Sequence, residues 1–125
     1  MNSAPGEEYV ELETSNEEGN ITVNVSGEAK WVIDVRGFPM PYEFHWFSPK
    51  KQDLISANNM KYSITYQLDQ NNIILTVHSV TMQDAGVYEF SAANSDKSAS
   101  IFLVLTVLGK DKCIQLFKMN KLYML

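Results

Sequence analysis

The middle of the chain alternates between hydrophobic and polar residues. Three early stretches, NITVNVS (20–26), AKWVIDV (29–35) and YEFHWF (42–47), each place every second side chain on one face. A period of two residues is the spacing of a β-strand, whose successive side chains point to opposite faces of a sheet. Glycine, proline and serine residues lie between the stretches and mark turns. These stretches therefore predict strands, each with one buried face.

The same alternation returns in the second half of the chain. YSITY (62–66) and NIILTVHSV (72–80) flank one polar turn, and GVYEFSA (86–92) and SASIFLVLTVL (98–108) flank another, which has the sequence NSDK. About seven to nine short strands with turn residues between them are typical of an antiparallel β-sandwich. No amphipathic helical pattern precedes residue 109, so a fold that alternates strands and helices is not expected.

The charge of the chain is distributed unevenly. The net charge is −5, and residues 1–19 hold six glutamates and no lysine or arginine. We expect this segment to be an acidic, solvated and flexible N-terminal arm that precedes a domain over residues 20–108. The chain has no basic stripe, which argues against a nucleic-acid partner.

The last segment, residues 109–125, mixes lysines with apolar residues in an irregular pattern. We interpret it as a remnant of a linker, or as a truncated or misread end. A short basic amphipathic segment at a membrane is the alternative interpretation.

The sequence offers little candidate chemistry. Cys113 is the only cysteine, which excludes an intrachain disulfide and a cysteine-based zinc site. His45 and His78 are far apart in the sequence, and we interpret them as solvent-facing strand residues rather than metal ligands. The sequence contains no glycine-rich phosphate loop, Ser-His-Asp set or HExxH motif. We therefore expect no enzymatic activity, cofactor, metal ion or small-molecule substrate.

Signals for the membrane and for secretion are weak. No run of eighteen apolar residues occurs, and the start MNSAPGEEYV lacks the basic and apolar regions of a signal peptide. Asn20 and Asn24 each begin an N-glycosylation sequon, and both lie on the same face of a predicted strand. If the protein is extracellular, we expect this chain to be part of a longer one that supplies the membrane attachment.

Several motifs together resemble I-set immunoglobulin domains. GFPMP (37–41) followed by Trp46 resembles their turn between the second and third strands, and LTV (75–77) followed by DAGVY (84–88) resembles their L-x-V…D-x-G-x-Y run. The AAN sequence that follows also fits. The resemblance covers about residues 20–108. It implies an all-β fold, an antiparallel two-sheet immunoglobulin-like sandwich.

The resemblance implies structural roles for the motif residues. Tyr88 takes the place of the tyrosine corner, whose hydroxyl bonds back to the backbone of the preceding turn. Asp84 is expected to pair with Lys61. Ile33 and Phe90 stand where the family usually has the two cysteines of its inter-sheet disulfide.

We expect apolar packing to replace the missing disulfide. A disulfide at these positions contributes about 4 kcal/mol by restricting the unfolded chain. Full burial of an isoleucine or a phenylalanine contributes roughly 1.5–3 kcal/mol each, which is of comparable size. The expected core consists of Ile33, Trp46, Leu75, Tyr88 and Phe90.

Immunoglobulin domains without the disulfide occur in two familiar settings. One is the fourth extracellular domain of the receptor tyrosine kinases for platelet-derived growth factor, stem-cell factor and vascular endothelial growth factor. The other is the intracellular I-set arrays of giant muscle proteins. The stretch YEFSAANSDKSASIFLVLTV resembles the first group. That group implies a non-enzymatic domain at the extracellular face of the plasma membrane, with any kinase outside this chain.

In such a receptor, the domain acts as a membrane-proximal spacer and makes a weak contact with a second copy. The family carries an arginine at the centre of that contact, and Ser79 stands in its place here. We expect any homotypic contact to use His78, Ser79 and Gln83. The alternatives are an intracellular module of a muscle or cytoskeletal protein and a domain of an adhesion or guidance receptor. Each of these functions implies protein partners.

Overall fold

The computed structural model describes residues 7–14, 19–55 and 60–109. Within these ranges the chain forms eight strands. They are β1 (Tyr9–Thr14), β2 (Asn20–Asn24), β3 (Ala29–Phe38), β4 (Glu43–Phe47), β5 (Tyr62–Gln67), β6 (Asn72–Val77), β7 (Gly86–Ala93) and β8 (Ser98–Leu108). Two short 3₁₀ helices, η2 (Leu68–Gln70) and η3 (Met82–Asp84), lie in the connections on either side of β6.

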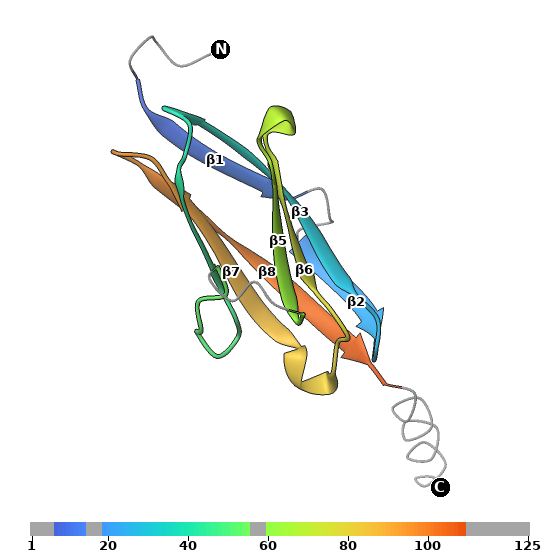
Figure 1. Ribbon diagram of the computed structural model, residues 1–125. Coiled ribbons are helices and arrows are strands. Elements are labelled where there is room, and N and C mark those ends of the chain that lie inside the picture. Colours follow the sequence, from blue (N-terminus) through green and yellow to red (C-terminus); the bar gives the residue numbers. More distant parts are fainter. Residues whose placement is uncertain (1–6, 15–18, 56–59, 110–125) are drawn as a thin grey trace, which may run out of the picture.

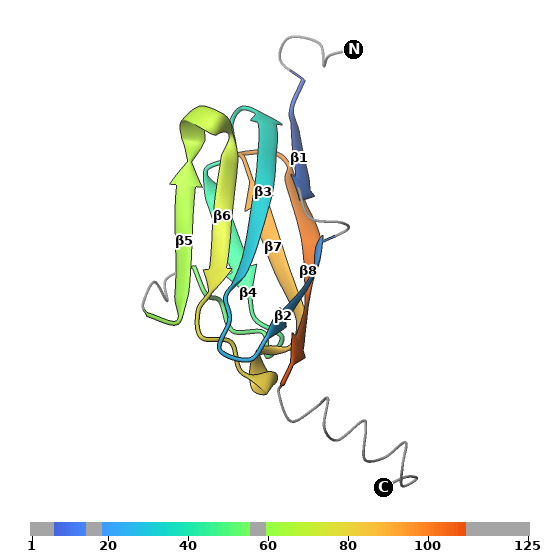
Figure 2. The same cartoon turned by 90° about the vertical axis from the view of Figure 1, so that its right-hand side faces the viewer.

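The strands form two four-stranded sheets that pack face to face (Figures 1 and 2). One sheet has the order β1-β3-β6-β5 and the other the order β2-β8-β7-β4. The predicted all-β immunoglobulin-like sandwich is therefore confirmed. One pairing departs from a purely antiparallel arrangement, because β2 runs parallel to β8. β1 and β2 follow one another in the chain but belong to different sheets.

The N-terminal segment contributes a strand, which the sequence analysis did not predict. β1 pairs with β3 over six residues, from Tyr9 opposite Phe38 to Thr14 opposite Ile33. The expectation of a flexible arm over 1–19 is therefore wrong for Tyr9–Thr14. The glutamates of this strand occupy its exposed positions, while Val10 and Leu12 pack against the core. Residues 1–6, 15–18 and 110–125 lie outside the described residues, and with them most of the predicted tail.

The core lies between the two sheets and is made by alternate residues of the strands. All five expected core residues belong to it, and at most 1% of the surface of each is exposed. Trp31 was not singled out from the sequence, although it lies at the centre. Its ring is 6.5 Å from that of Trp46 and 5.3 Å from that of Tyr88, measured between centroids. Its indole nitrogen donates a hydrogen bond of 3.0 Å to the Gly19 carbonyl.

Gly37 lies where β1 and the turn after β3 come close together. A Cβ atom at this position would lie 2.8 Å from the Tyr9 carbonyl oxygen and 2.8 Å from Cδ of Pro41. Both distances are shorter than van der Waals contact, so only glycine fits here without a shift of the backbone. The glycine of the GFPMP motif therefore allows β1 to join the sheet.

Candidate interaction surfaces

The turn before β7 is held together by Asp84. One oxygen of its carboxylate accepts hydrogen bonds from the Lys61 ammonium at 2.6 Å and from the Thr81 amide at 2.7 Å. The Tyr88 hydroxyl donates to the Asp84 carbonyl at 2.6 Å. The structure thus brings together Lys61, Asp84 and Tyr88, the residues to which the sequence analysis gave roles in this turn.

The electrostatics of this turn follow from burial and pairing. Burial alone would raise the pKa of Asp84, but the Lys61 ammonium and the Thr81 amide outweigh it, so the pKa lies below its ordinary value. Burial raises the pKa of the Tyr88 hydroxyl, which is neutral and acts as a donor. A shallow depression of ≈ 320 Å³ beside the turn is lined in part by Lys61 and Asp84. These two groups already satisfy one another, so they stabilise the fold.

The three residues expected in a homotypic contact lie at the same end of the sandwich. Ser79 and Gln83 are exposed. His78 is half-buried and lies 2.7 Å from a carboxylate oxygen of Glu28 and 3.0 Å from the Ser63 hydroxyl. A contact that needs a free His78 therefore competes with these internal partners. A homotypic contact at this end stays a prediction.

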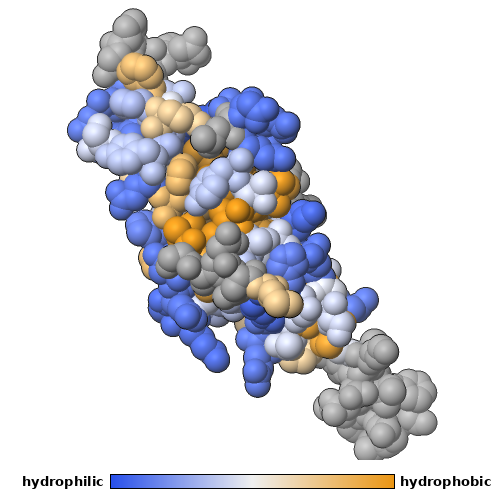
Figure 3. Space-filling model, viewed as in Figure 1, coloured by the Kyte–Doolittle hydropathy of each residue, from blue (hydrophilic) through white to orange (hydrophobic). Residues whose placement is uncertain are grey.

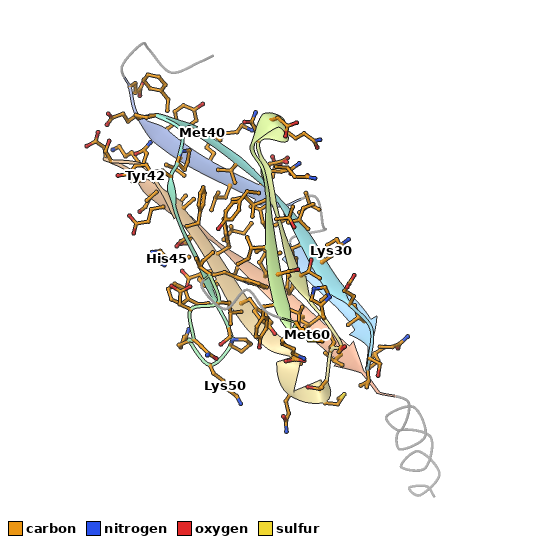
Figure 4. The ribbon with its side chains drawn as sticks, in the orientation of Figure 1. Lys30, Met40, Tyr42, His45, Lys50 and Met60 are labelled. Carbon is orange, nitrogen blue, oxygen red and sulfur yellow. The ribbon has the colours of Figure 1, made fainter. Side chains whose placement is uncertain are left out.

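His45 on β4 is flanked by two carboxylates, which the sequence analysis did not foresee. Nδ1 of its ring lies 2.8 Å from Asp53, and Nε2 lies 3.1 Å from Glu43. These hydrogen bonds, first that to Asp53 and then that to Glu43, raise the pKa of His45 above 6.5, and slight burial opposes them. His45 is 41% exposed and projects from β4 away from β5 and β6 (Figure 4).

Metal and membrane sites receive no support in the described part of the chain. No group of three or more histidine, cysteine, aspartate or glutamate side chains in residues 7–14, 19–55 and 60–109 is arranged to hold a metal ion. The two carboxylates beside His45 lie against different ring nitrogens. None of the helices in these residues has the length and apolar character needed to cross a membrane.

The glycosylation sequons lie on the exposed side of β2. Asn20 and Asn24 are both exposed, while Ile21 and Val23 between them face the core. The geometry therefore allows a sugar at either asparagine. Its presence stays a prediction.

The exposed apolar surface of the described residues includes two areas on the sheets. The first lies in the middle of the face shown in Figure 3, between β4 and β5. There Phe44 and Ile64 are half-buried, and Tyr66 is exposed with its ring 5.7 Å from that of Phe44. The second lies on the outer face of β7 and β8, where Val87 and Phe102 are exposed. Single exposed apolar residues are common, but grouped ones often mark contact surfaces.

The sequence matches one protein family over most of the described domain. The model of the immunoglobulin I-set domain matches residues 12–107. The chain belongs to the immunoglobulin I-set family. The match begins inside β1, which agrees with the observed strand rather than with a domain that starts at residue 20. Among curated protein sequences, the comparison finds no match.

Solved structures similar to this I-set domain include domains of titin. Titin domain M7 has 25% identity and a TM-score of 0.63, over 77% of this chain and 92% of that chain. Titin domains A168–A170 have 28% identity and a TM-score of 0.65, over 80% of this chain and 32% of that chain. A complex of titin M10 with an obscurin-like 1 immunoglobulin domain has 27% identity and a TM-score of 0.62, over 72% and 86%. The comparisons give no support to the resemblance with receptor tyrosine kinases.

Proposed function

We propose that this I-set domain is a non-enzymatic module of an intracellular muscle or cytoskeletal protein. In that setting it links neighbouring domains and binds other proteins. We therefore prefer the intracellular module, an alternative function in the sequence analysis, to a domain of an extracellular receptor. It is supported by the likeness to titin domains at 25–28% identity.

The likeness to titin domains carries the proposal, and the packing at the missing disulfide is consistent with it. Ile33 and Phe90, at the two positions where the family usually has cysteines, are both fully buried within the core. Proteins of the cytosol are kept reduced, so a disulfide contributes nothing to their stability there. A domain that fills both positions with large apolar side chains is stable without oxidation, which suits an intracellular location.

The path of the chain supports the linking role. β1 begins near one end of the long axis of the sandwich, and β8 ends at the opposite end (Figure 1). A preceding and a following domain joined at these ends would therefore lie in line. Tension along such an array pulls β2 and β8 in opposite directions, because the two strands run parallel. Their hydrogen bonds would then be loaded together along the strands.

The binding role is supported by complexes of similar domains. Titin domains similar to this chain occur in complexes with an obscurin-like 1 immunoglobulin domain and with telethonin. We extend the general property, binding to a protein partner, to this chain. The exposed apolar areas described above are its candidate contact surfaces.

The location of the native protein in muscle tissue tests the proposal. An antibody against the domain should label permeabilised muscle fibres in a regular striated pattern and should not label intact cells. The matched control is the same antibody absorbed with the purified domain. Labelling of intact cells, together with a loss of mass after treatment with peptide N-glycosidase, would contradict the proposal.

The same treatment tests the receptor interpretation, which the exposed sequons favour. An extracellular domain should lose mass in the wild type, and the variant with Asn20→Gln and Asn24→Gln should show no change. A cytosolic domain should show no change in either form. The two interpretations therefore predict different results for the wild-type protein.

A further inference from the structure

A line of apolar side chains follows β8 on the outer face of its sheet. Phe102, Val104 and Leu108 lie on this face, with the exposed Thr106 between Val104 and Leu108, and Val87 on β7 lies directly opposite Val104. Phe102 is 60% exposed and Val87 is 51% exposed. We call these four residues the outer stripe. Val87, Phe102 and Val104 are neighbours on the sheet, and Thr106 separates them from Leu108. Solvent contact with these apolar side chains is unfavourable.

The outer stripe leads to the point where the chain leaves the domain. Leu108 is the last residue of β8, and Gly109 follows it. A side chain at position 109 would lie 3.5 Å from the sulfur of Met82 and 3.6 Å from Val25, which are both exposed apolar residues. The described part of the chain therefore ends, after β8 and at Gly109, beside apolar side chains.

In the strands of the sheet that carries the outer stripe, the side chains with a permanent charge are all negative. β2, β4, β7 and β8 contain Glu43 and Glu89 but no lysine or arginine. Glu89 lies directly opposite Phe102, and Asp53 lies beside His45 at the β4 edge. The complementary occupant of this face is therefore a segment that is both apolar and positively charged.

The segment that follows in the chain has this composition. Residues 110–125 contain four lysines and one aspartate, a net charge of +3, while the rest of the chain carries −8. Their large apolar residues include Ile114, Leu116, Phe117, Leu122 and Leu125. An extended segment of this length spans ~50 Å, and the outer stripe from Leu108 to Phe102 is ~20 Å long. The segment is long enough to turn back and cover the stripe.

We propose that residues 110–125 dock in cis on the outer stripe of the same molecule. The apolar side chains of the segment cover Val87, Phe102 and Val104, and its lysines lie near Glu89 and Glu43. A tethered segment has an effective concentration of the order of mM, so a weak contact suffices. A second copy is a poorer occupant, because two such faces would bring like charges together. A protein partner that uses this face must first displace the segment.

The single cysteine allows a direct test on the full chain. A nitroxide attached to Cys113 weakens the nuclear magnetic resonance signals of amides near it. Docking should weaken the signals of Glu89, Phe102 and Val104, on one face of one sheet. A free segment should instead weaken signals around Val25 and Met82 on all sides of that end of the sandwich. This second pattern would overturn the proposal.

Substitutions in the outer stripe test whether the weakened signals require contact of the segment with these side chains. The double variant Phe102→Ser, Glu89→Lys should restore the weakened signals, whereas Tyr66→Ser should leave them weak. Tyr66 is a matched control because it is an exposed aromatic residue, 45% exposed, on the other sheet. Thermal melting verifies that each variant is folded. Signals that stay weak in the double variant would contradict the contact.

A mixture of two forms of the protein tests whether the contact is made in cis. Nitroxide-labelled chains without ¹⁵N are combined with unlabelled chains that carry ¹⁵N. Docking in cis should leave the signals of the second form unchanged. Weakening of Glu89, Phe102 and Val104 in this mixture would show docking between molecules and overturn the proposal.

Discussion

At the residue scale, Phe90 is decisive for the stability of the core. It is fully buried, lies opposite Trp46 in the pairing of β7 with β4, and stacks on Phe44 at 6.1 Å. Phe90→Ala should lower the free energy of unfolding by about 3–5 kcal/mol, through lost burial and the cavity left behind. Denaturant melting measures this change. Tyr42→Ala is the control, because Tyr42 is exposed and should change stability by less than about 0.5 kcal/mol. A loss below about 1 kcal/mol for Phe90→Ala would reject the assigned role.

The two positions of the missing disulfide make a second prediction at this scale. The variant with Ile33→Cys and Phe90→Cys, in a Cys113→Ser background, should oxidise to a disulfide between the sheets. Its oxidised form should be more stable than its reduced form by up to about 4 kcal/mol. Thiol titration and melting with and without a reductant measure both effects. Two free thiols after treatment with oxidised glutathione would show that the alignment with the family is wrong at these positions.

His45 makes the stability of the domain depend on pH. Its pKa is raised in the folded protein by Asp53 and then by Glu43, so its charged form is favoured by folding. The resulting stabilisation is complete below the unfolded pKa of about 6.5 and is lost as the pH rises through the folded pKa. The side chain is well exposed, so the effect should remain below about 1 kcal/mol. Urea melting at pH 5.5 and pH 8 should show a smaller difference for His45→Gln than for the wild type. Equal differences would contradict the role of this residue.

At the element scale, the attachment of β1 depends on one glycine. Because a Cβ atom at Gly37 would lie 2.8 Å from the Tyr9 carbonyl, Gly37→Ala should push β1 away from β3. We expect a loss of about 1–3 kcal/mol and faster hydrogen exchange of the amides of Tyr9–Thr14. Gly109→Ala is the matched control, since a Cβ atom there makes only ordinary contacts. Unchanged exchange in β1 of the Gly37→Ala variant would contradict this explanation.

The same strand shows what the sequence predicts well and what it does not. In β2, β3, β7 and β8 the burial of successive residues follows the predicted period of two. β1 alternates too, but its polar positions are glutamates in an acidic segment, and composition favoured a solvated arm. Its place depends on pairing with residues distant in the sequence, from Ile33 to Phe38 of β3, which local patterns do not record.

The same distinction holds for the polar contacts. The Lys61–Asp84 contact followed from a family motif, and the structure brings the two groups to 2.6 Å. The pairing of His45 with Asp53 had no such signal, because it depends on the loop after β4. In that loop Lys51 has a φ of 70°, and the Ser48 amide bonds to the Gln52 carbonyl. These local bonds turn the chain back so that Asp53 lies beside Phe47.

At the scale of the whole molecule, we predict that the domain is monomeric at micromolar concentration. The chain carries a net charge of −5, so copies repel one another weakly at neutral pH. At the end that carries the predicted homotypic contact, His78 is held by Glu28 and Ser63, and the Ser79 carbonyl accepts a hydrogen bond from Lys61. These internal partners compete with contacts to a second copy, so any association should be weak.

Analytical ultracentrifugation measures this property directly. The wild type should sediment as a monomer, and weak association at higher concentration should decrease when Ser79 and Gln83 are both changed to glutamate. In a two-fold contact the same patch of one copy meets that of the other, so the added negative charges repel across it. Thr65→Glu on the edge strand β5 is the control, because Thr65 is exposed on the other side of the sandwich from β7 and β8. A tight dimer that tolerates the changes at Ser79 and Gln83 would reject the predicted contact. If Thr65→Glu dissolved such a dimer, the pairing surface would be β5, which is an edge strand of its sheet and could pair with a strand of a second copy.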